Sequence, residues 1–80
     1  MAVKLVFLGK LADLAGAAEM ELPAPLNWSG LLATLDPELG KAVAGEKTRI
    51  AVDGELLSDK ELLAAVDGTE VAFLPPVSGG

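Results

Sequence analysis

Few side chains in this 80-residue sequence can carry out covalent chemistry by themselves. Cysteine and histidine are both absent, which removes the thiolate nucleophile, the usual zinc ligands and the commonest general base. Asp53 and Glu55 flank a glycine, but the ligand spacing of a calcium loop is missing and a tight turn explains the pair. The nine glycines nowhere form the G-x-x-x-x-G-K-[ST] pattern of a phosphate-binding loop. We therefore predict a non-catalytic chain with no metal site and no bound cofactor.

The remaining reactive group is at the end of the chain, which reads "FLPPVSGG" over residues 73–80. Pro75 and Pro76 lack N–H donors, so they are predicted to end a strand and to keep the chain extended. Six extended residues span roughly 20 Å, enough to enter a buried pocket of another protein. Gly79 and Gly80 carry no side chain and suit a narrow channel. The terminal carboxylate of Gly80 becomes an acyl donor once it is activated, for example as an acyl-adenylate.

Length, composition and charge limit what kind of protein presents this tail. Eighty residues allow one small domain, and the 51% apolar fraction is typical of a folded chain. The net charge is −6 and the basic residues do not cluster in the sequence, which disfavours nucleic acid and fits a basic protein partner better. The opening apolar run is too short and too often interrupted by charge for a membrane span, and no cleavage region follows it. We expect a soluble cytoplasmic protein with no membrane partner.

The hydrophobic pattern predicts the elements that must position the tail. Asn27 is a suitable N-cap for a helix that carries Trp28 and three leucines on one face and ends before Pro37. Asp53-Gly54 predicts a type I′ hairpin. Residues 59–65 are expected to form one helical turn with Leu62 and Leu63 packed inward. The full expected order is strand 3–8, short helix 10–15, strand 19–22, the long helix, an optional short turn at 37–43, strands 49–52 and 55–57, and strand 70–74.

This order predicts an α+β fold of the β-grasp, or ubiquitin-like, type. A hairpin, a crossing helix and a later hairpin would build a mixed sheet of about five strands with one main covering helix. Residues 1–74 are expected to form the domain and residues 75–80 the extended tail. A β-grasp domain that ends in an exposed Gly-Gly has the physical form of a ubiquitin-like carrier.

The sequence resembles the small, sulfur-carrier subunit of molybdopterin synthase over essentially its whole length. The most specific match is "DGTEVAFLPPVSGG", residues 67–80, against the family's closing D-G-D-E-V-A-F-x-P-P-V-[ST]-G-G. The opening "VKLVFLGKLADLAG" is similar to the family's first strand and short helix. Many members have Arg-Glu where this chain has Ala12-Asp13, so a partner salt bridge from that arginine is not expected here.

The resemblance implies a mechanism and a set of partners. An ATP-dependent activating enzyme would adenylate the carboxylate of Gly80, and a sulfur donor would convert it to a thiocarboxylate. The tail, with Val77, Ser78 and Gly79 in the channel, would then enter the large synthase subunit and give its sulfur to cyclic pyranopterin monophosphate. Two sulfurs build the dithiolene of molybdopterin, which fits a heterotetramer of two small and two large subunits. ATP is used by the activating enzyme, and the catalytic side chains belong to the large subunit.

The partner surface is expected on the sheet face opposite Trp28. Apolar residues lie on both faces of the outer elements, and a helix on one side of the sheet cannot bury all of them. The residues expected at this interface are Leu8, Phe73, Leu74, Pro75 and Pro76.

Three alternatives to this role stay open. One is a sulfur carrier for another pathway, such as thiazole synthesis for thiamine, although the Phe-Leu-Pro-Pro lead-in argues against it. Another is a ubiquitin-like modifier that joins its tail to a target lysine. The last is an interaction domain that would keep its binding without the final two residues.

Overall fold

The computed structural model describes residues 2–75, and Met1 and residues 76–80 lie outside this range. The chain alternates short strands with short helices, as the sequence pattern predicts. The elements are β1 (Ala2–Phe7), α1 (Lys10–Ala15), β2 (Glu19–Pro23), β3 (Leu26–Asn27), α2 (Trp28–Thr34), α3 (Pro37–Ala44), β4 (Arg49–Val52), β5 (Glu55–Leu56), the 3₁₀ turn η1 (Lys60–Leu62), β6 (Ala64–Ala65) and β7 (Glu70–Leu74).

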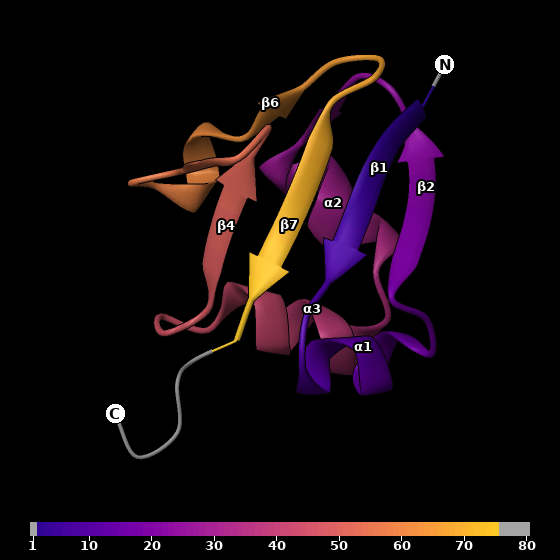
Figure 1. Cartoon of the computed structure of the whole chain (residues 1–80), viewed down its shortest axis with the longest axis vertical. Coiled ribbons are helices and arrows are strands. Elements are labelled where there is room, and N and C mark those ends of the chain that lie inside the picture. Colours follow the sequence, from indigo (N-terminus) through magenta and orange to yellow (C-terminus); the bar gives the residue numbers. More distant parts are fainter. Residues whose placement is uncertain (1, 76–80) are drawn as a thin grey trace.

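Five strands form one mixed sheet in the order β2-β1-β7-β4-β5 (Figure 1). The first and last strands of the sequence lie side by side at its centre and run parallel, with Phe7 opposite Phe73. The other pairs are antiparallel, with Leu5 opposite Met20 between β1 and β2, and Ile50 opposite Phe73 between β4 and β7. The predicted mixed five-strand sheet is confirmed, including the antiparallel first hairpin.

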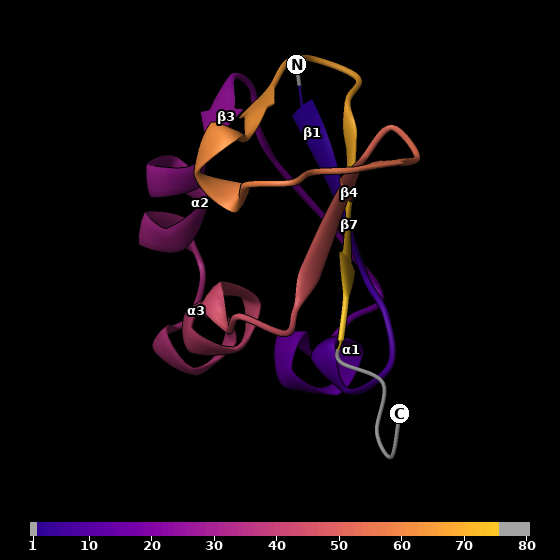
Figure 2. The ribbon, with the colours of Figure 1, turned by 90° about the vertical axis from the view of Figure 1, so that its left-hand side faces the viewer.

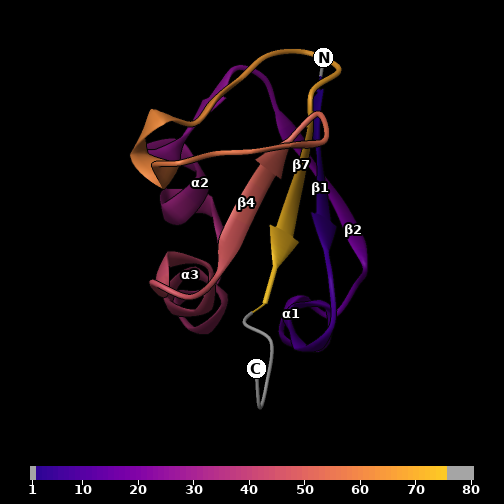
Figure 3. The ribbon, with the colours of Figure 1, turned by 60° about the vertical axis from the view of Figure 1, so that its left-hand side comes forward.

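The helices α2 and α3 cover one face of the sheet, and α1 lies at the end where β7 finishes (Figures 2 and 3). The predicted covering helix is present as α2, and the Asn27 side chain accepts a hydrogen bond from the N–H of Gly30 at 2.8 Å. The short turn expected after it is a full helix, α3. Pro37 occupies the first turn of α3 and Asp36 before it is extended, because a residue preceding proline avoids the helical region.

The core lies between the sheet and these helices and is mostly aliphatic. Alternation along the central strands places Val3, Leu5 and Phe7 of β1 inward, and Val71 and Phe73 of β7 beside them. The rings of Phe7 and Phe73 stack with their centroids 5.1 Å apart and their planes 11° from parallel. This pair fixes the two central strands to each other from the buried side.

The segment after β5 departs from the prediction. Instead of one helical turn over residues 59–65, it forms η1 followed by β6, which pairs with β3 in a separate two-stranded sheet. Leu63 is buried as predicted, but Leu62 is 65% exposed, so its inward assignment was wrong. A 3₁₀ turn has three residues per turn, and that rotation points consecutive leucines in different directions.

Two Asp-Gly turns hold the ends of the central strands. Asp53 and Gly54 both have positive φ, 49° and 87°, which confirms the predicted type I′ hairpin. The Asp53 N–H donates to the carbonyl of Glu70, and its carboxylate accepts the N–H of Glu70. At the same end, the Asp67 carboxylate accepts the N–H of Ala2.

Among residues 2–75, no helix is long and apolar enough to cross a lipid bilayer.

Lys60 joins η1 to the end of α3. Its ammonium group donates to the carbonyl oxygens of Val43, at 2.8 Å, and Gly45, which are among the acceptors that a helix end leaves without an internal partner. The ammonium also lies 6.0 Å from the centre of the Trp28 ring. Burial, with a smaller effect from the nearby Arg49, lowers the pKa of Lys60. The contact therefore links α2, α3 and η1 through one side chain.

We expect Lys60→Met to lower the free energy of unfolding by about 1–2 kcal/mol, because the Val43 carbonyl loses its ammonium donor and the Gly45 carbonyl keeps only the N–H of Thr48, while the apolar stem is kept. For a domain of this size each 1 kcal/mol corresponds to about 4–8 °C in melting temperature. Lys47→Met is the control, since Lys47 is exposed and the described part of the chain gives its ammonium no ion pair or side-chain hydrogen bond. Equal melting of the two variants would contradict the assignment.

Candidate docking face and tail root

The face of the sheet away from α2 and α3 is apolar across its middle. The register aligns Val6, Ala72, Ala51 and Leu56 in one row across four strands, all on this face. The first three are half-buried, and Leu56 is 64% exposed. Figure 2 shows no helix on this side of the sheet. We call this surface the open face, and it is available to a partner.

One end of the open face carries a cluster of charged side chains, and the other is apolar apart from the exposed Arg49, which lies opposite Leu74. At the charged end, the Lys4 ammonium lies 3.4 Å from Glu19 and 3.8 Å from Glu70, an exposed cluster of small energetic value. At the opposite end, Leu8 and Leu74 each follow the Phe7–Phe73 register pair, so both project to the open face. Leu8 is 43% exposed and Leu74 is half-buried. The apolar surface thus reaches the point where the chain leaves the sheet.

One residue assigned to this surface by sequence does not belong to it. Phe73 has 0% of its surface exposed and stacks on Phe7 inside the core. Its neighbours Ala72 and Leu74 point the other way. The prediction that Phe73 contacts a partner was wrong, because strand alternation assigns consecutive residues to opposite faces.

Gly9 and Pro75 form the root of the tail. Gly9 has φ +56° and ψ −135° at the start of α1, a backbone conformation that glycine adopts far more readily than other residues. A β-carbon built on Gly9 would lie 3.1 Å from Cγ of Pro75, so the missing side chain leaves room for the proline ring. The close approach joins the end of β1 to the end of β7. Pro75, which the sequence assigned to the interface, is half-buried and is the last residue that the structure describes.

The other predicted tail residues, Pro76, Val77, Ser78, Gly79 and Gly80, lie outside the described residues. Within residues 2–75, no group of three or more acidic side chains is arranged to hold a metal ion. The functional geometry that the structure does describe is therefore a surface and an exit point. The sequence assigned Leu8, Leu74 and Pro75 to the interface, and the structure brings them together at this end of the sheet. It gave no role to Gly9, whose only signal was its position directly after the first predicted strand.

A parallel pair of first and last strands inside a mixed sheet, with helices packed across one face, defines the class of small ubiquitin-like β-grasp domains. The model of the ThiS family matches residues 5–80. The chain belongs to this family of ubiquitin-like sulfur carriers, whose small carrier proteins are generally non-catalytic. A search of curated proteins found no match.

Several solved structures share the fold along their full length. Small archaeal modifier protein 1 (SAMP1) from Methanosarcina acetivorans is 28% identical, with a TM-score of 0.75 over 99% of this chain and 96% of that one. In the complex of subunits 1 and 2 of molybdopterin-converting factor from Helicobacter pylori, the matching chain is 26% identical, with a TM-score of 0.69 over 100% of both chains. SAMP1 from Haloferax volcanii shares the fold at 21% identity and a TM-score of 0.74, over 100% of both chains.

The tail root gives a prediction with an internal control. Gly9→Ala should lower the free energy of unfolding by about 1–2 kcal/mol, because an L-residue is strained in the left-handed region, and the contact with Pro75 should add to the loss. Gly40→Ala should instead raise it by about 0.5–1 kcal/mol, because Gly40 lies inside α3 and a β-carbon there meets nothing within 4 Å. Chemical denaturation of both variants measures the difference. Equal and small effects would show that Gly9 is not constrained.

Proposed function

We propose that this chain is the sulfur carrier of molybdopterin synthesis, with the carboxylate of Gly80 as the group that is loaded. An activating enzyme joins this carboxylate to AMP with release of pyrophosphate from ATP. A donor that supplies sulfur as hydrosulfide then displaces AMP from the acyl carbon and leaves a thiocarboxylate. The large subunit of molybdopterin synthase receives the tail and transfers the sulfur to cyclic pyranopterin monophosphate, which returns the carboxylate for another cycle. A dithiolene takes two such transfers.

The observation that carries this proposal is the continuity of the open face with the tail root. Val6, Ala72 and Leu74 lead along the apolar surface directly to Pro75. A partner that covers this surface therefore meets the tail where it begins. Family membership through residue 80 and the full-length likeness to the matching chain of the two-subunit molybdopterin-converting factor complex support the same role.

The chain's own part in this chemistry is to position and to carry. Its described residues form no group of three or more acidic side chains that could hold a metal ion, and the whole sequence lacks cysteine and histidine. Acid–base and transfer steps then fall to the partner enzymes, which we propose to be an adenylating enzyme and the large synthase subunit. The β-grasp domain provides a rigid base from which the tail extends.

Protein modification is a second candidate, favoured by the 28% identity to SAMP1 of Methanosarcina acetivorans, whose name describes it as a modifier. Both functions begin with adenylation of Gly80 and differ in the acceptor. A modifier gives its acyl group to a lysine amine and stays attached as an isopeptide. A sulfur carrier gives up sulfur and is recovered unattached. Incubation with ATP and cell extract distinguishes them, since only the modifier accumulates as higher-mass conjugates.

Deletion of Gly80, or addition of one residue after it, should abolish sulfur loading without changing the melting temperature. The change displaces the carboxylate from the nucleotide site of the activating enzyme, while a chain end contributes little to folding. Intact-mass analysis after incubation with the activating enzyme, ATP and sulfide measures the replacement of oxygen by sulfur. A Gly80-deleted chain that still supports molybdopterin synthesis would refute the carrier function.

Leu74→Glu should weaken binding to the large synthase subunit by about tenfold or more, because it places a charge on the apolar end of the open face. The fold should persist, since the side chain is only half-buried and points away from the core. Leu62→Glu is the matched control, because Leu62 is exposed on the helix side of the sheet. Calorimetric titration measures the affinities and circular dichroism the folding. If Leu74→Glu unfolds the domain, Leu74 is a core residue and the face is assigned wrongly.

A further inference from the structure

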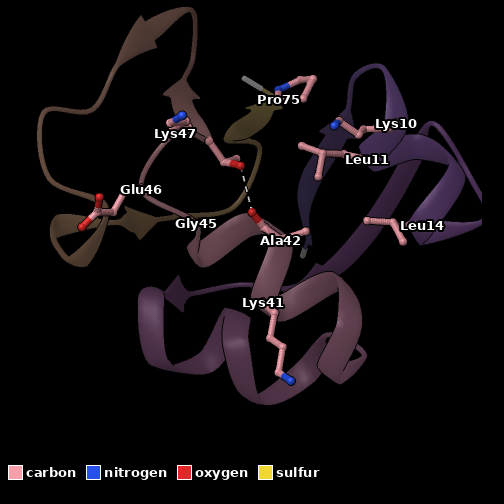
Figure 4. A pocket seen from close by; sticks show the side chains of 10 residues that line it. Lys10, Leu11, Leu14, Lys41, Ala42, Gly45, Glu46, Lys47 and Pro75 are labelled. Carbon is pink, nitrogen blue, oxygen red and sulfur yellow. Dashed lines mark hydrogen bonds between the residues drawn. The ribbon is translucent and has the colours of Figure 1, made fainter. Parts of the chain in front are cut away.

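A hollow of about 350 Å³ lies beside the tail root, between α1 and the segment that follows α3. Figure 4 shows Lys10, Leu11 and Leu14 on one side of it, Gly45 and Lys47 on the other, and Pro75 between them. Leu11 is buried and forms part of the floor, while Leu14 remains 44% exposed. The hollow therefore has an apolar interior large enough for the side chain of another protein.

The floor of the hollow is rigid. The Thr48 side chain is buried, and its hydroxyl donates to the carbonyl of Ala42 at 2.8 Å. The N–H of Thr48 donates to the carbonyl of Gly45, and the N–H of Gly45 donates to that of Ala42. These bonds fix the segment after α3 against the helix, so the hollow is formed before any partner arrives.

The rim of the hollow is basic in a chain that is otherwise strongly acidic. Lys10, Lys41 and Lys47 line it, against one acidic residue, Glu46. These lysines are three of the six basic residues in a chain of net charge −6. The ion pairs among residues 2–75 involve Lys4 alone, so none of the three is neutralised within the described structure. The fold thus gathers charges that are scattered in the sequence.

The position of the hollow connects it to the docking face. Pro75 lines the hollow and also ends the apolar surface that contains Leu8 and Leu74. A protein that takes in the tail must approach this end of the domain, where Lys10 and Lys47 flank Pro75 (Figure 4). The ammonium of Lys41 points away from both of them in the same view, so Lys10 and Lys47 are the cations of the hollow that face such a partner. The exposed Arg49, opposite Leu74, lies on the neighbouring open face and outside the lining of the hollow.

We propose that the hollow receives an apolar side chain flanked by carboxylates, presented by the protein that takes in the tail. This inference rests on the proposed function and adds the chemistry of the partner's contact. The apolar side chain packs on Leu11, Leu14 and Pro75, and the carboxylates meet Lys10 and Lys47. Opposite charges at the rim of an interface mainly accelerate association and set orientation. The contact therefore aligns the domain as the tail enters.

The test compares a variant that lacks two lysine charges at the hollow with a control variant of the same net charge. Lys10→Gln/Lys47→Gln removes two positive charges at the hollow. Ser29→Glu/Ser58→Glu makes the same change in net charge at two exposed positions, one on α2 and one before η1, away from the tail root. Leu14→Gln tests the apolar wall separately. Binding of each full-length chain to the large synthase subunit and to the adenylating enzyme is measured by titration calorimetry at low and high salt.

We expect the lysine variant to bind at least one of these proteins about threefold to thirtyfold more weakly at low salt. The difference should shrink at high salt, because screening weakens exposed charge pairs. Leu14→Gln should weaken binding severalfold at both salt concentrations. The serine variant should bind like the wild type. A carbodiimide cross-linker, which joins lysine to carboxylate directly, should link Lys10 or Lys47 to acidic residues of the partner.

Two negative results have different meanings. If the wild type binds and the lysine variant matches the serine variant at both salt concentrations, the inference is wrong and the carrier function stands. Cross-links that form only from Lys4 or Lys60 would also overturn it. If the wild type binds neither protein, the proposed function is refuted and the inference is refuted with it.

Discussion

The parallel pairing of β1 with β7 is the constraint on which the rest of the structure depends. It joins the first and last strands of the sequence at the centre of the sheet, so the domain cannot complete its core until the chain is nearly finished. The stacked rings of Phe7 and Phe73 fix this pair from the buried side. Burial of each ring contributes about 2–3 kcal/mol. The tail root follows directly from this pair.

Strand alternation then divides functions between the two faces of the sheet. Inward residues hold the fold, and outward residues, such as Val6, Ala72 and Leu74, are left for a partner. The same alternation makes Leu8 and Leu74 neighbours at the tail root although 66 positions separate them in the sequence. Gly9 and Pro75 meet at that point for the same reason. A small chain can therefore present a surface and a tail together without a separate binding lobe.

The sequence predicted the parts of the fold that local patterns encode. Alternating strands, the Asn27 cap and the Asp53-Gly54 turn were all expected and are present. The β3–β6 pair was missed because two-residue strands are too short to show an alternating pattern of apolar and polar residues. Leu62 was misassigned because the rotation per residue in a 3₁₀ turn decides where its side chain points. Phe73 was misassigned because strand alternation decides which face of the sheet it lies on. Lys60 and the basic hollow had no local signal, and Gly9 had only its position after the first predicted strand, since each of these features arises from contacts between distant segments.

The placement of β7 also has a mechanical consequence. Because β7 is bonded on both sides, to β1 and to β4, a pull at its C-terminal end acts along the strand. The hydrogen bonds to the antiparallel β4 run perpendicular to that direction and those to the parallel β1 are slanted to it, so many of them share the load at once. A chain end at the edge of a sheet would instead peel away one bond at a time. A force applied at this end of the chain would therefore have to break many hydrogen bonds together before the domain opened.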